Sequence, residues 1–386
     1  MTDISTTSAT RMTILCVVGA RPNFMKMAPI ISALNNLPSK PRVHLLHTGQ
    51  HYDVAMNSQY FEALGIPAPD TNLNVGSGSH TVQTAEVMLR FEPVLDELKP
   101  SMVLVVGDVN STIACALVAA KKGIPVAHVE AGLRSSDRSM PEELNRILTD
   151  QLSDLLFTTE SSGRVNLLRE GIHSDRIHFV GNVMIDTLLG NLDRAVPISR
   201  ILETANQPTF TSQHDQYALL TMHRPANVDN AEILSTLLDT IRKISSRLPV
   251  VFPVHPRTKA MIEKFHLNSV LESPQILLLP PMGYLEMLGL MKGARVVLTD
   301  SGGVQEETTA LGVPCITLRN NTERPITVEQ GTNTIAGQDP IVILNVFEEI
   351  MKTGGKTGRS PELWDGNAST RIATIIEKWL TSNRQI

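Results

Sequence analysis

The amino-acid sequence predicts an α/β protein made of two doubly wound domains, with a ligand site in the cleft between them. Three observations favour this fold. The chain has 386 residues, more than a single hydrophobic core usually organises. Short apolar runs alternate with segments of helical periodicity, as in parallel sheets covered by helices on both faces. The same order of strand, polar loop, helix and strand also occurs in both halves.

The clearest unit of the first half starts with an apolar run at residues 102–106, which ends at Gly107 and Asp108. Ser111 is expected to cap the helix that follows, because its hydroxyl can accept a hydrogen bond from the first turn. Residues 125–129 are the next predicted strand. A strand, a helix and a second strand in this order predict a βαβ unit.

The second half repeats this order. Residues 295–299 are a predicted strand, Asp300 begins a polar loop, and residues 304–311 have helical periodicity. Gly312 ends the helix, and the next strand starts at Val313. Two similarly wound halves are the simplest explanation of this recurrence.

The domain boundary is expected in the polar, proline-containing region of residues 190–216. The predicted domains therefore cover residues 11–190 and 191–365. Apolar residues at helical spacing near the C-terminus predict a last helix within about residues 366–386, which is expected to join the first domain.

Composition and charge exclude several classes of protein. The net charge of −5 and the pI near 6.1 give no basic field, so a nucleic-acid partner is not expected. Neither a leader peptide nor an apolar run of roughly 18 residues is visible, which predicts a soluble, cytoplasmic protein with no membrane partner. The scattered cysteines, Cys16, Cys115 and Cys315, have no metal-ligand spacing and are expected in the core.

A candidate phosphate site follows the strand at residues 295–299. Ser301, Gly302 and Gly303 open a helix there, and bare backbone N–H groups at a helix start attract anions. Glu306 or Glu307 could accept hydrogen bonds from ribose hydroxyls. The alternative is a tight turn with acidic residues favoured by the helix dipole.

Three cations could face the same anion. Arg21 and Lys26 follow the first apolar run, and Arg324 lies in the second half. A guanidinium can grip a phosphate with two parallel hydrogen bonds, whereas an ammonium acts as a point charge. A solvated loop with a lysine on a helix face is the alternative for the first two.

A set of carboxylates belongs to the first half. Asp108 and Glu130 close neighbouring predicted strands, so both are expected at one edge of the sheet. Glu142 starts a helix. Carboxylates gathered in this way suit proton transfer at carbon. Glu142 and Arg146 are four residues apart, so a surface ion pair between them is the alternative.

Two histidines of the second half, His223 and His255, follow predicted strands. Either could contact a phosphate or a sugar, or could be a structural hydrogen-bonding residue. Neither belongs to a metal-binding motif such as HExxH, so no catalytic metal is predicted.

Together these segments resemble the non-hydrolysing UDP-N-acetylglucosamine 2-epimerases. The motifs that carry the resemblance are, in order, GARPNFMKMAPI, TGQHYD, GDVNSTIA, HVEAGLRSSDRSMPEELNR, GNVMIDTL, TMHRPAN, TDSGGVQEE and NTERPITVEQGTN. They span nearly the whole chain. The resemblance implies two Rossmann-like domains of GT-B-like fold, uridine diphosphate (UDP) held mainly by the second domain, and a homodimer.

The family reaction interconverts UDP-GlcNAc and UDP-ManNAc without a metal or a redox cofactor. The resemblance implies that UDP is eliminated to leave a 2-acetamidoglucal. A proton then reaches C2 on the opposite face, and UDP adds back. Such a reaction needs cations and helix N–H groups for the departing diphosphate, and acid and base groups near C2.

The matching motifs imply roles for the candidate residues. The catalytic group, near C2 or at the departing UDP, consists of Lys26, Asp108, Glu130, Glu142, Arg146 and His223. The substrate-binding group consists of Arg21, His255, Ser301, Gly302, Gly303, Glu307 and Arg324. Which carboxylate removes the proton stays open.

Some segments differ from those of bacterial relatives, so alternatives for the regulation, the substrate and the reaction stay open. Gln50 to Asp53, the short stretch of residues 137–141 and the residues after His255 differ from common bacterial forms, so activation by a second UDP-GlcNAc molecule is left open. The SSDRSMPEE segment resembles epimerases of UDP-diacetamido-uronic acids, which keeps such a sugar as an alternative substrate. A retaining glycosyltransferase of GT-B fold is the other alternative.

Overall fold

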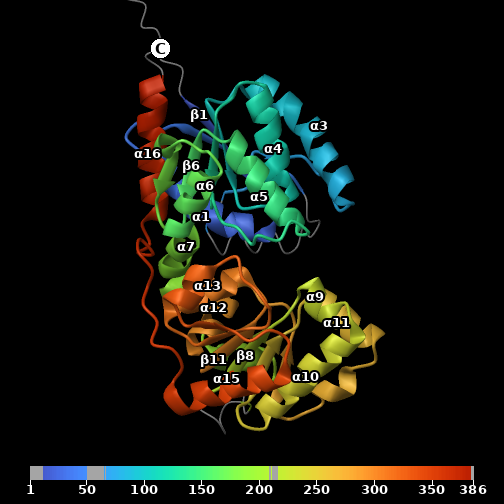
Figure 1. Cartoon of the computed structure of the whole chain (residues 1–386). Coiled ribbons are helices and arrows are strands. Elements are labelled where there is room, and N and C mark those ends of the chain that lie inside the picture. Colours follow the sequence, from blue (N-terminus) through green and yellow to red (C-terminus); the bar gives the residue numbers. More distant parts are fainter. Residues whose placement is uncertain (1–11, 50–64, 66, 208–209, 211–215, 384–386) are drawn as a thin grey trace, which may run out of the picture. The chain divides into compact units, whose positions relative to one another are not determined.

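The computed structural model describes residues 12–49, 65, 67–207, 210 and 216–383 (Figure 1). Contacts divide the chain into a first unit, Met1–Val183 with Asn367–Ile386, and a second unit, Met184–Gly366. The division falls at Val183, inside a helix, rather than in the polar region that follows. Residues 190–216 therefore belong to the second unit, where they include a helix that packs on its sheet.

The first unit contains a seven-stranded parallel sheet in the order β3-β2-β1-β4-β5-β6-β7. Its strands are β1 (Thr13–Val18), β2 (Arg42–His47), β3 (Thr71–Asn72), β4 (Met102–Val106), β5 (Val126–Val129), β6 (Leu155–Thr158) and β7 (Ile177–Phe179). Its helices are α1 (Arg21–Asn35), α3 (His80–Leu98), α4 (Asn110–Lys121), α5 (Pro141–Leu152), α6 (Ser161–Arg169), η1 (Ser174–Arg176) and α16 (Ala368–Ser382). Helix α7 (Val183–Asn191) starts at the division between the units.

The second unit contains a six-stranded parallel sheet in the order β10-β9-β8-β11-β12-β13. Its strands are β8 (Ala218–Thr221), β9 (Val250–Pro253), β10 (Ile276–Leu279), β11 (Val296–Thr299), β12 (Cys315–Thr317) and β13 (Asn333–Ile335). Its helices are η2 (Leu192–Arg194), α8 (Ile198–Thr204), α9 (Pro225–Val228), α10 (Ala231–Ser245), α11 (Pro256–Lys264), η3 (Asn268–Leu271), α12 (Tyr284–Gly293), α13 (Gly302–Leu311), α14 (Pro325–Glu329) and α15 (Pro340–Thr353).

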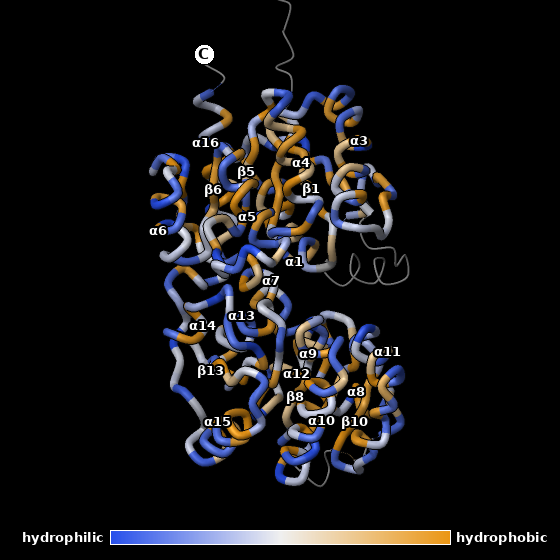
Figure 2. Tube along the Cα trace, turned by 45° about the vertical axis from the view of Figure 1, so that its right-hand side comes forward, coloured by the Kyte–Doolittle hydropathy of each residue, from blue (hydrophilic) through white to orange (hydrophobic). Residues whose placement is uncertain are grey.

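Side chains of the first sheet alternate between two hydrophobic cores. Ile14 and Cys16 of β1 pack with α1 and α16, whereas Leu15 and Val17 pack with α3 and α4 on the opposite face. Helices therefore cover both faces (Figure 1), and apolar colour is concentrated on the central strands, such as β1 (Figure 2). This two-sided burial explains why β1 and β4 are continuous apolar runs in the sequence.

The second sheet is built in the same way. Leu220 and Phe252 pack with α10 and α15, whereas Leu219 and Val251 pack with α8 and α12. The prediction of two doubly wound α/β domains is confirmed by these two sheets. No helix of the described residues is long and apolar enough to cross a membrane.

Two local expectations are corrected. Ser111 does not cap α4, because the helix starts one residue earlier, at Asn110, and the Ser111 hydroxyl lies 2.7 Å from the Thr48 hydroxyl. Helix α13 starts at Gly302, two residues before the predicted start at Val304, so Gly302 and Gly303 form its first turn. Gln50 to Asp53, singled out as a departure from bacterial relatives, lie outside the described residues. All three cysteines are buried, as predicted.

Candidate active site

The first group of candidate residues lies where β4 and β5 end. The two strands pair in parallel, with Val106 opposite Val129, so the loops that follow them are neighbours. Asp108 lies on the first loop and Glu130 on the second. The structure therefore brings these two carboxylates to one edge of the sheet, as the sequence predicted.

Glu130 is bound to a lysine from the first helix. The Lys26 ammonium, on α1, forms an ion pair with the Glu130 carboxylate, and both residues are buried. Gly107 lies against this pair, because a Cβ atom there would be 3.3 Å from Lys26 Nζ. Gly107 also has a φ of +68°, which favours glycine. The close approach of the backbone to the Lys26–Glu130 pair explains why a glycine follows β4.

Glu130 itself has a φ of +76°, a left-handed conformation that is uncommon for a residue with a side chain. Hydrogen bonds of 3.1 and 3.0 Å from the N–H groups of Glu130 and Ala131 to the Phe157 carbonyl hold the turn. Backbone strain of this kind concentrates at functional sites. It turns the Glu130 side chain toward Lys26 at the carboxyl end of the sheet.

Arg146, on α5, connects this helix to the loop after β4. Its Nη1 lies 2.5 Å from Asp108 Oδ2, and its Nη2 lies 2.7 Å from Glu143 Oε2. The alternative of a surface pair with Glu142 is wrong, since Arg146 is only 2% exposed and binds Glu143 instead. On a helix, residues three positions apart and residues four positions apart are both neighbours. Here Glu143, three residues before Arg146, lies with it on the buried face of α5.

Glu143 also holds the loop that precedes α5. Its carboxylate accepts hydrogen bonds from the backbone N–H groups of Ser135 and Ser136 and from the Ser135 hydroxyl. Burial raises the pKa of Glu143, but the hydrogen bonds from Ser135 and Arg146 outweigh this and hold the pKa below its usual value. The ionised Glu143 therefore fixes Arg146, and its neighbour Glu142 stays at the start of the helix.

The second group lies where β8 and β11 end. These strands also pair in parallel, with Thr221 opposite Thr299. Asp300 follows β11 and is fully buried. Its carboxylate accepts hydrogen bonds from the backbone N–H groups of His223 and Arg224, at 3.0 and 2.9 Å, and from Asn227 Nδ2 at 3.0 Å. Asp300 thus fastens the loop after β8 to the start of α13.

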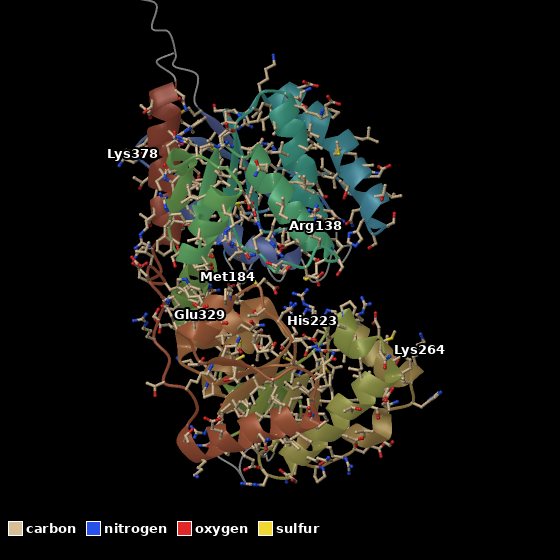
Figure 3. The ribbon with its side chains drawn as sticks, in the orientation of Figure 1. Arg138, Met184, His223, Lys264, Glu329 and Lys378 are labelled. Carbon is tan, nitrogen blue, oxygen red and sulfur yellow. The ribbon has the colours of Figure 1, made fainter. Side chains whose placement is uncertain are left out.

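His223 is oriented by the same carboxylate. Its Nδ1 lies 3.1 Å from Asp300 Oδ1, while about a third of its side chain is exposed. Figure 3 labels His223 in the second unit. Burial raises the pKa of Asp300, but the bonds from His223 and Arg224 lower it below the usual value. The His255 ring lies beside His223 with 5.3 Å between centroids. Its Nδ1 accepts a hydrogen bond from the Arg257 N–H at 3.2 Å.

A buried cluster of charges lies at the first turn of α13. Arg324 Nε pairs with Glu306 at 2.6 Å. Glu323 pairs with Arg319 at 2.9 Å and with Arg224 at 3.3 Å. Burial raises the pKa of Glu323, but the three arginines together lower it to about 2. Three guanidinium groups thus lie with two carboxylates at the start of α13, where helix N–H groups favour an anion.

Glu306 and Glu307 have different surroundings. Glu306 binds Arg324, which removes it as the first choice for a ribose. Glu307 is 4% exposed and lies near Tyr284, whose pKa is raised far above its usual range by burial and by the Glu307 charge. Of the two carboxylates left open by the sequence, Glu307 therefore remains the candidate for the ribose.

Comparison with known proteins identifies the family. A model of the family described as UDP-N-acetylglucosamine 2-epimerase matches residues 35–377. The chain belongs to the UDP-N-acetylglucosamine 2-epimerase family. It is 44% identical over 363 residues to the UDP-N-acetylglucosamine 2-epimerase of Methanococcus maripaludis, covering 93% of this chain and 97% of that protein.

Two further relatives of this epimerase family are informative. The crystal structure of Methanocaldococcus jannaschii UDP-GlcNAc 2-epimerase in complex with UDP-GlcNAc and UDP superposes with a TM-score of 0.85 at 43% identity, covering 95% of this chain and 100% of that one. The UDP-2,3-diacetamido-2,3-dideoxy-D-glucuronate 2-epimerase of Pseudomonas aeruginosa is 39% identical, covering 95% of this chain and 100% of that protein. The predicted GT-B-like class of two Rossmann-like domains is confirmed by the solved relative.

The residues predicted for this epimerase-family chain fall at the carboxyl edges of the two sheets. The first edge brings together Lys26, Asp108, Glu130 and Arg146, with Glu142 at the start of α5. The second brings together His223, His255, Ser301, Gly302, Gly303, Glu307 and Arg324. Arg21 begins α1, but its side chain lies outside the described part of the structure. Among the described residues, no group of three metal-ligating side chains is present.

Sequence reasoning missed the residues that hold these candidates in place. Glu143, Asp300 and Glu323 are buried carboxylates that bind Arg146, His223 and the arginine cluster. All three adjoin a predicted residue in the sequence, since Glu143 follows Glu142, Asp300 precedes Ser301 and Glu323 precedes Arg324. The adjacent charges Glu142–Glu143 and Glu323–Arg324 were a visible signal, but the sequence does not say whether one or both members of such a pair are buried.

Proposed function

We propose that the protein interconverts UDP-GlcNAc and UDP-ManNAc as a non-hydrolysing epimerase. The observation that carries the proposal is a pair of cation-bound carboxylates at the edge of the first sheet, the buried Glu130 with Lys26 and the partly exposed Asp108 with Arg146. A glycosyltransferase would have little use for this set, whereas proton transfer at a sugar carbon requires it.

The chemistry proceeds in two halves. A carboxylate removes the proton from C2, the electron pair of that C–H bond forms the C1–C2 double bond, and the C1–O bond breaks with its electrons on UDP. The product pair is 2-acetamidoglucal and UDP. A second acid then gives a proton to the other face of C2, and a UDP oxygen adds to C1. Asp108, Glu130 and Glu142 supply the acid and base, and Arg146 orients Asp108.

The second unit takes the UDP portion in this proposal. Ser301, Gly302 and Gly303 at the start of α13 offer backbone N–H groups, and Arg324 adds positive charge. His223 and His255 present their Nε2 atoms to the diphosphate, and Glu307 accepts hydrogen bonds from the ribose. Stabilising the charge that grows on departing UDP lowers the barrier to elimination.

A single incubation tests the proposal. We expect purified protein with UDP-GlcNAc in deuterated water, without added metal or nicotinamide cofactor, to produce UDP-ManNAc and to replace the C2 proton with deuterium. Proton NMR follows both changes. Intact, unexchanged UDP-GlcNAc would contradict this substrate, and release of UDP only with a sugar acceptor would support a glycosyltransferase.

A second substrate is favoured by one specific observation. The 39% identity to the diacetamido-glucuronate 2-epimerase of P. aeruginosa spans 95% of this chain. The alternative proposal is therefore epimerisation at C2 of a UDP-diacetamido-uronic acid by the same elimination and re-addition. The two sugars are compared in the same deuterium assay, and the higher kcat/KM identifies the preferred substrate.

We also propose that the protein is a cytoplasmic homodimer, joined through α3 and α5 of the first unit. Both helices flank α4, and each exposes apolar side chains: Val82 and Leu89 on α3, Leu144 and Leu148 on α5. Exposed apolar side chains four or seven residues apart on one helix are typical of a surface that another protein covers.

The double variant Leu144→Lys with Leu148→Lys is expected to be a monomer, because two charges would be buried at the interface without partners. Size-exclusion chromatography with light scattering measures the mass. Ile341→Lys is the matched control, since Ile341 is 69% exposed on α15 of the second unit. If the double variant and the control have the same dimer mass, α5 is not the interface.

A further inference from the structure

A buried histidine lies between the two loops that carry Asp108 and Glu130. His128 is on β5, two residues before Glu130, and is fully buried. Its Nδ1 lies 2.7 Å from Asp150 Oδ1, and its Nε2 lies 2.8 Å from the carbonyl oxygen of Gly107. Gly107 directly precedes Asp108, so the two ring nitrogens contact groups on different elements.

Both partners of the His128 ring are hydrogen-bond acceptors. A carbonyl oxygen can only accept. The Asp150 carboxylate already accepts the Gly132 N–H at 3.0 Å and Arg134 Nη2 at 2.7 Å through its other oxygen. Burial raises the pKa of Asp150, but the bonds from His128 and Arg134 hold it below the usual value. Since neither partner donates, both ring nitrogens must carry a proton.

The charge of a doubly protonated His128 is compensated within the same network. Arg134 makes two bonds to Glu170, at 2.8 and 2.6 Å, in addition to its bond to Asp150. The imidazolium and the guanidinium therefore face two carboxylates, with no net charge. Burial of an unpaired imidazolium would be strongly unfavourable, and the network removes that cost.

The network connects every element that carries a proposed acid or base. His128 holds the Gly107 carbonyl on the loop after β4, where Asp108 lies. Asp150 holds the N–H of Gly132, which has a φ of +79°, on the loop after β5 that carries Glu130. Asp150 is also on α5, the helix of Glu142 and Arg146.

We propose that His128, as an imidazolium bound to Asp150, is a positioning residue that sets the spacing of Asp108 and Glu130. This inference rests on the proposed function, in which those two carboxylates act at C2 of the sugar. His128 does not touch the substrate. It determines where the loops after β4 and β5 lie relative to one another, and displacement of a catalytic group by about 1 Å can cost about 100-fold in rate.

The protonation state is tested without substrate. We expect long-range ¹H–¹⁵N NMR of histidine-labelled protein to show both ring nitrogens of His128 with the shift of protonated nitrogen at neutral pH. The signal is assigned by its loss in His128→Gln. One nitrogen with the shift of an unprotonated imidazole would overturn the imidazolium assignment.

Kinetics test the positioning role. His128→Gln keeps one donor and one acceptor, so either Asp150 or the Gly107 carbonyl faces an oxygen. We expect kcat to fall about 100-fold with KM nearly unchanged, because the UDP-binding groups lie in the other unit. The matched control is His44→Gln, a buried histidine of the same sheet whose Nε2 lies 2.9 Å from the Thr71 hydroxyl. This control is expected to keep the wild-type kcat.

The possible outcomes separate the two proposals. Wild-type protein that is active while His128→Gln keeps its kcat would overturn the positioning role. An equal loss of kcat in His128→Gln and His44→Gln would do the same, because it would indicate a general effect of removing a buried histidine. Wild-type protein inactive on both candidate sugars, with both His128 nitrogens protonated, would instead contradict the proposed function and leave the imidazolium assignment intact.

Discussion

Asp108→Asn is expected to lower kcat by about 10² to 10⁴-fold, the range that general acid–base groups usually contribute. Asparagine has nearly the same size but cannot take a proton from carbon or share the charge of Arg146. Arg146 Nη1, now 2.5 Å from Asp108 Oδ2, would keep only Glu143 as a charged partner. The deuterium assay at C2 and steady-state kinetics on UDP-GlcNAc measure the loss, and UDP affinity is expected to stay constant.

The same substitution at Asp154 is the control. Asp154 lies at the other end of β5, where its Oδ2 accepts the Val126 N–H at 2.9 Å. Asp154→Asn therefore removes a carboxylate at the amino end of the same sheet and leaves the carboxyl end unaltered. We expect kcat to be unchanged. A wild-type kcat in Asp108→Asn would exclude Asp108 as acid or base and leave Glu130 and Glu142 as the candidates.

The strands, and the sheet edges at which the candidate residues lie, could be predicted because their signals are local in the sequence. A parallel strand covered on both faces must be apolar throughout, so residues 102–106 and 295–299 stand out from their polar neighbours. Ligands bind beyond the carboxyl ends of such strands, which directs attention to Asp108, Glu130 and Ser301 without any knowledge of packing.

The partners of these residues could not be predicted in the same way. Spacing allows Arg146 to meet Glu142 or Glu143, and the choice depends on which side of α5 faces the sheet. The left-handed backbone of Glu130 has no sequence signal, because glycine is absent there. His128 and Asp150 are 22 residues apart and meet only because β5 packs on α5. Contacts between elements depend on the complete fold rather than on a local pattern.

Asp300 is a residue whose expected role changes once its contacts with other elements are known. In the sequence it is the first residue of the turn predicted to bind phosphate, and its neighbours Ser301 to Gly303 are the predicted binding residues. In the structure its carboxylate accepts hydrogen bonds from a loop 77 residues earlier in the sequence. We therefore expect Asp300 to act through His223 rather than on the substrate.

Asp300→Asn is expected to lower kcat/KM strongly and to destabilise the second unit by about 1–3 kcal/mol, the usual cost of a buried polar group without its partner. Its amide nitrogen would face N–H donors from His223, Arg224 and Asn227. Because the folded pKa of Asp300 is depressed, its stabilisation is present above the unfolded pKa of about 3.9 and is lost as the pH falls below it. The difference in Tm between wild type and variant should shrink accordingly in acid.

A double-mutant cycle separates the effect on His223 from the effect on folding. If Asp300 acts by orienting His223, Asp300→Asn should cost much less kcat/KM in a His223→Gln background than in the wild type. Asp339→Asn is the control, because Asp339 only caps α15 through a 2.8 Å bond to the Ile341 N–H. Fully additive losses of Asp300→Asn and His223→Gln would mean that Asp300 supports the loop after β8 independently of the imidazole.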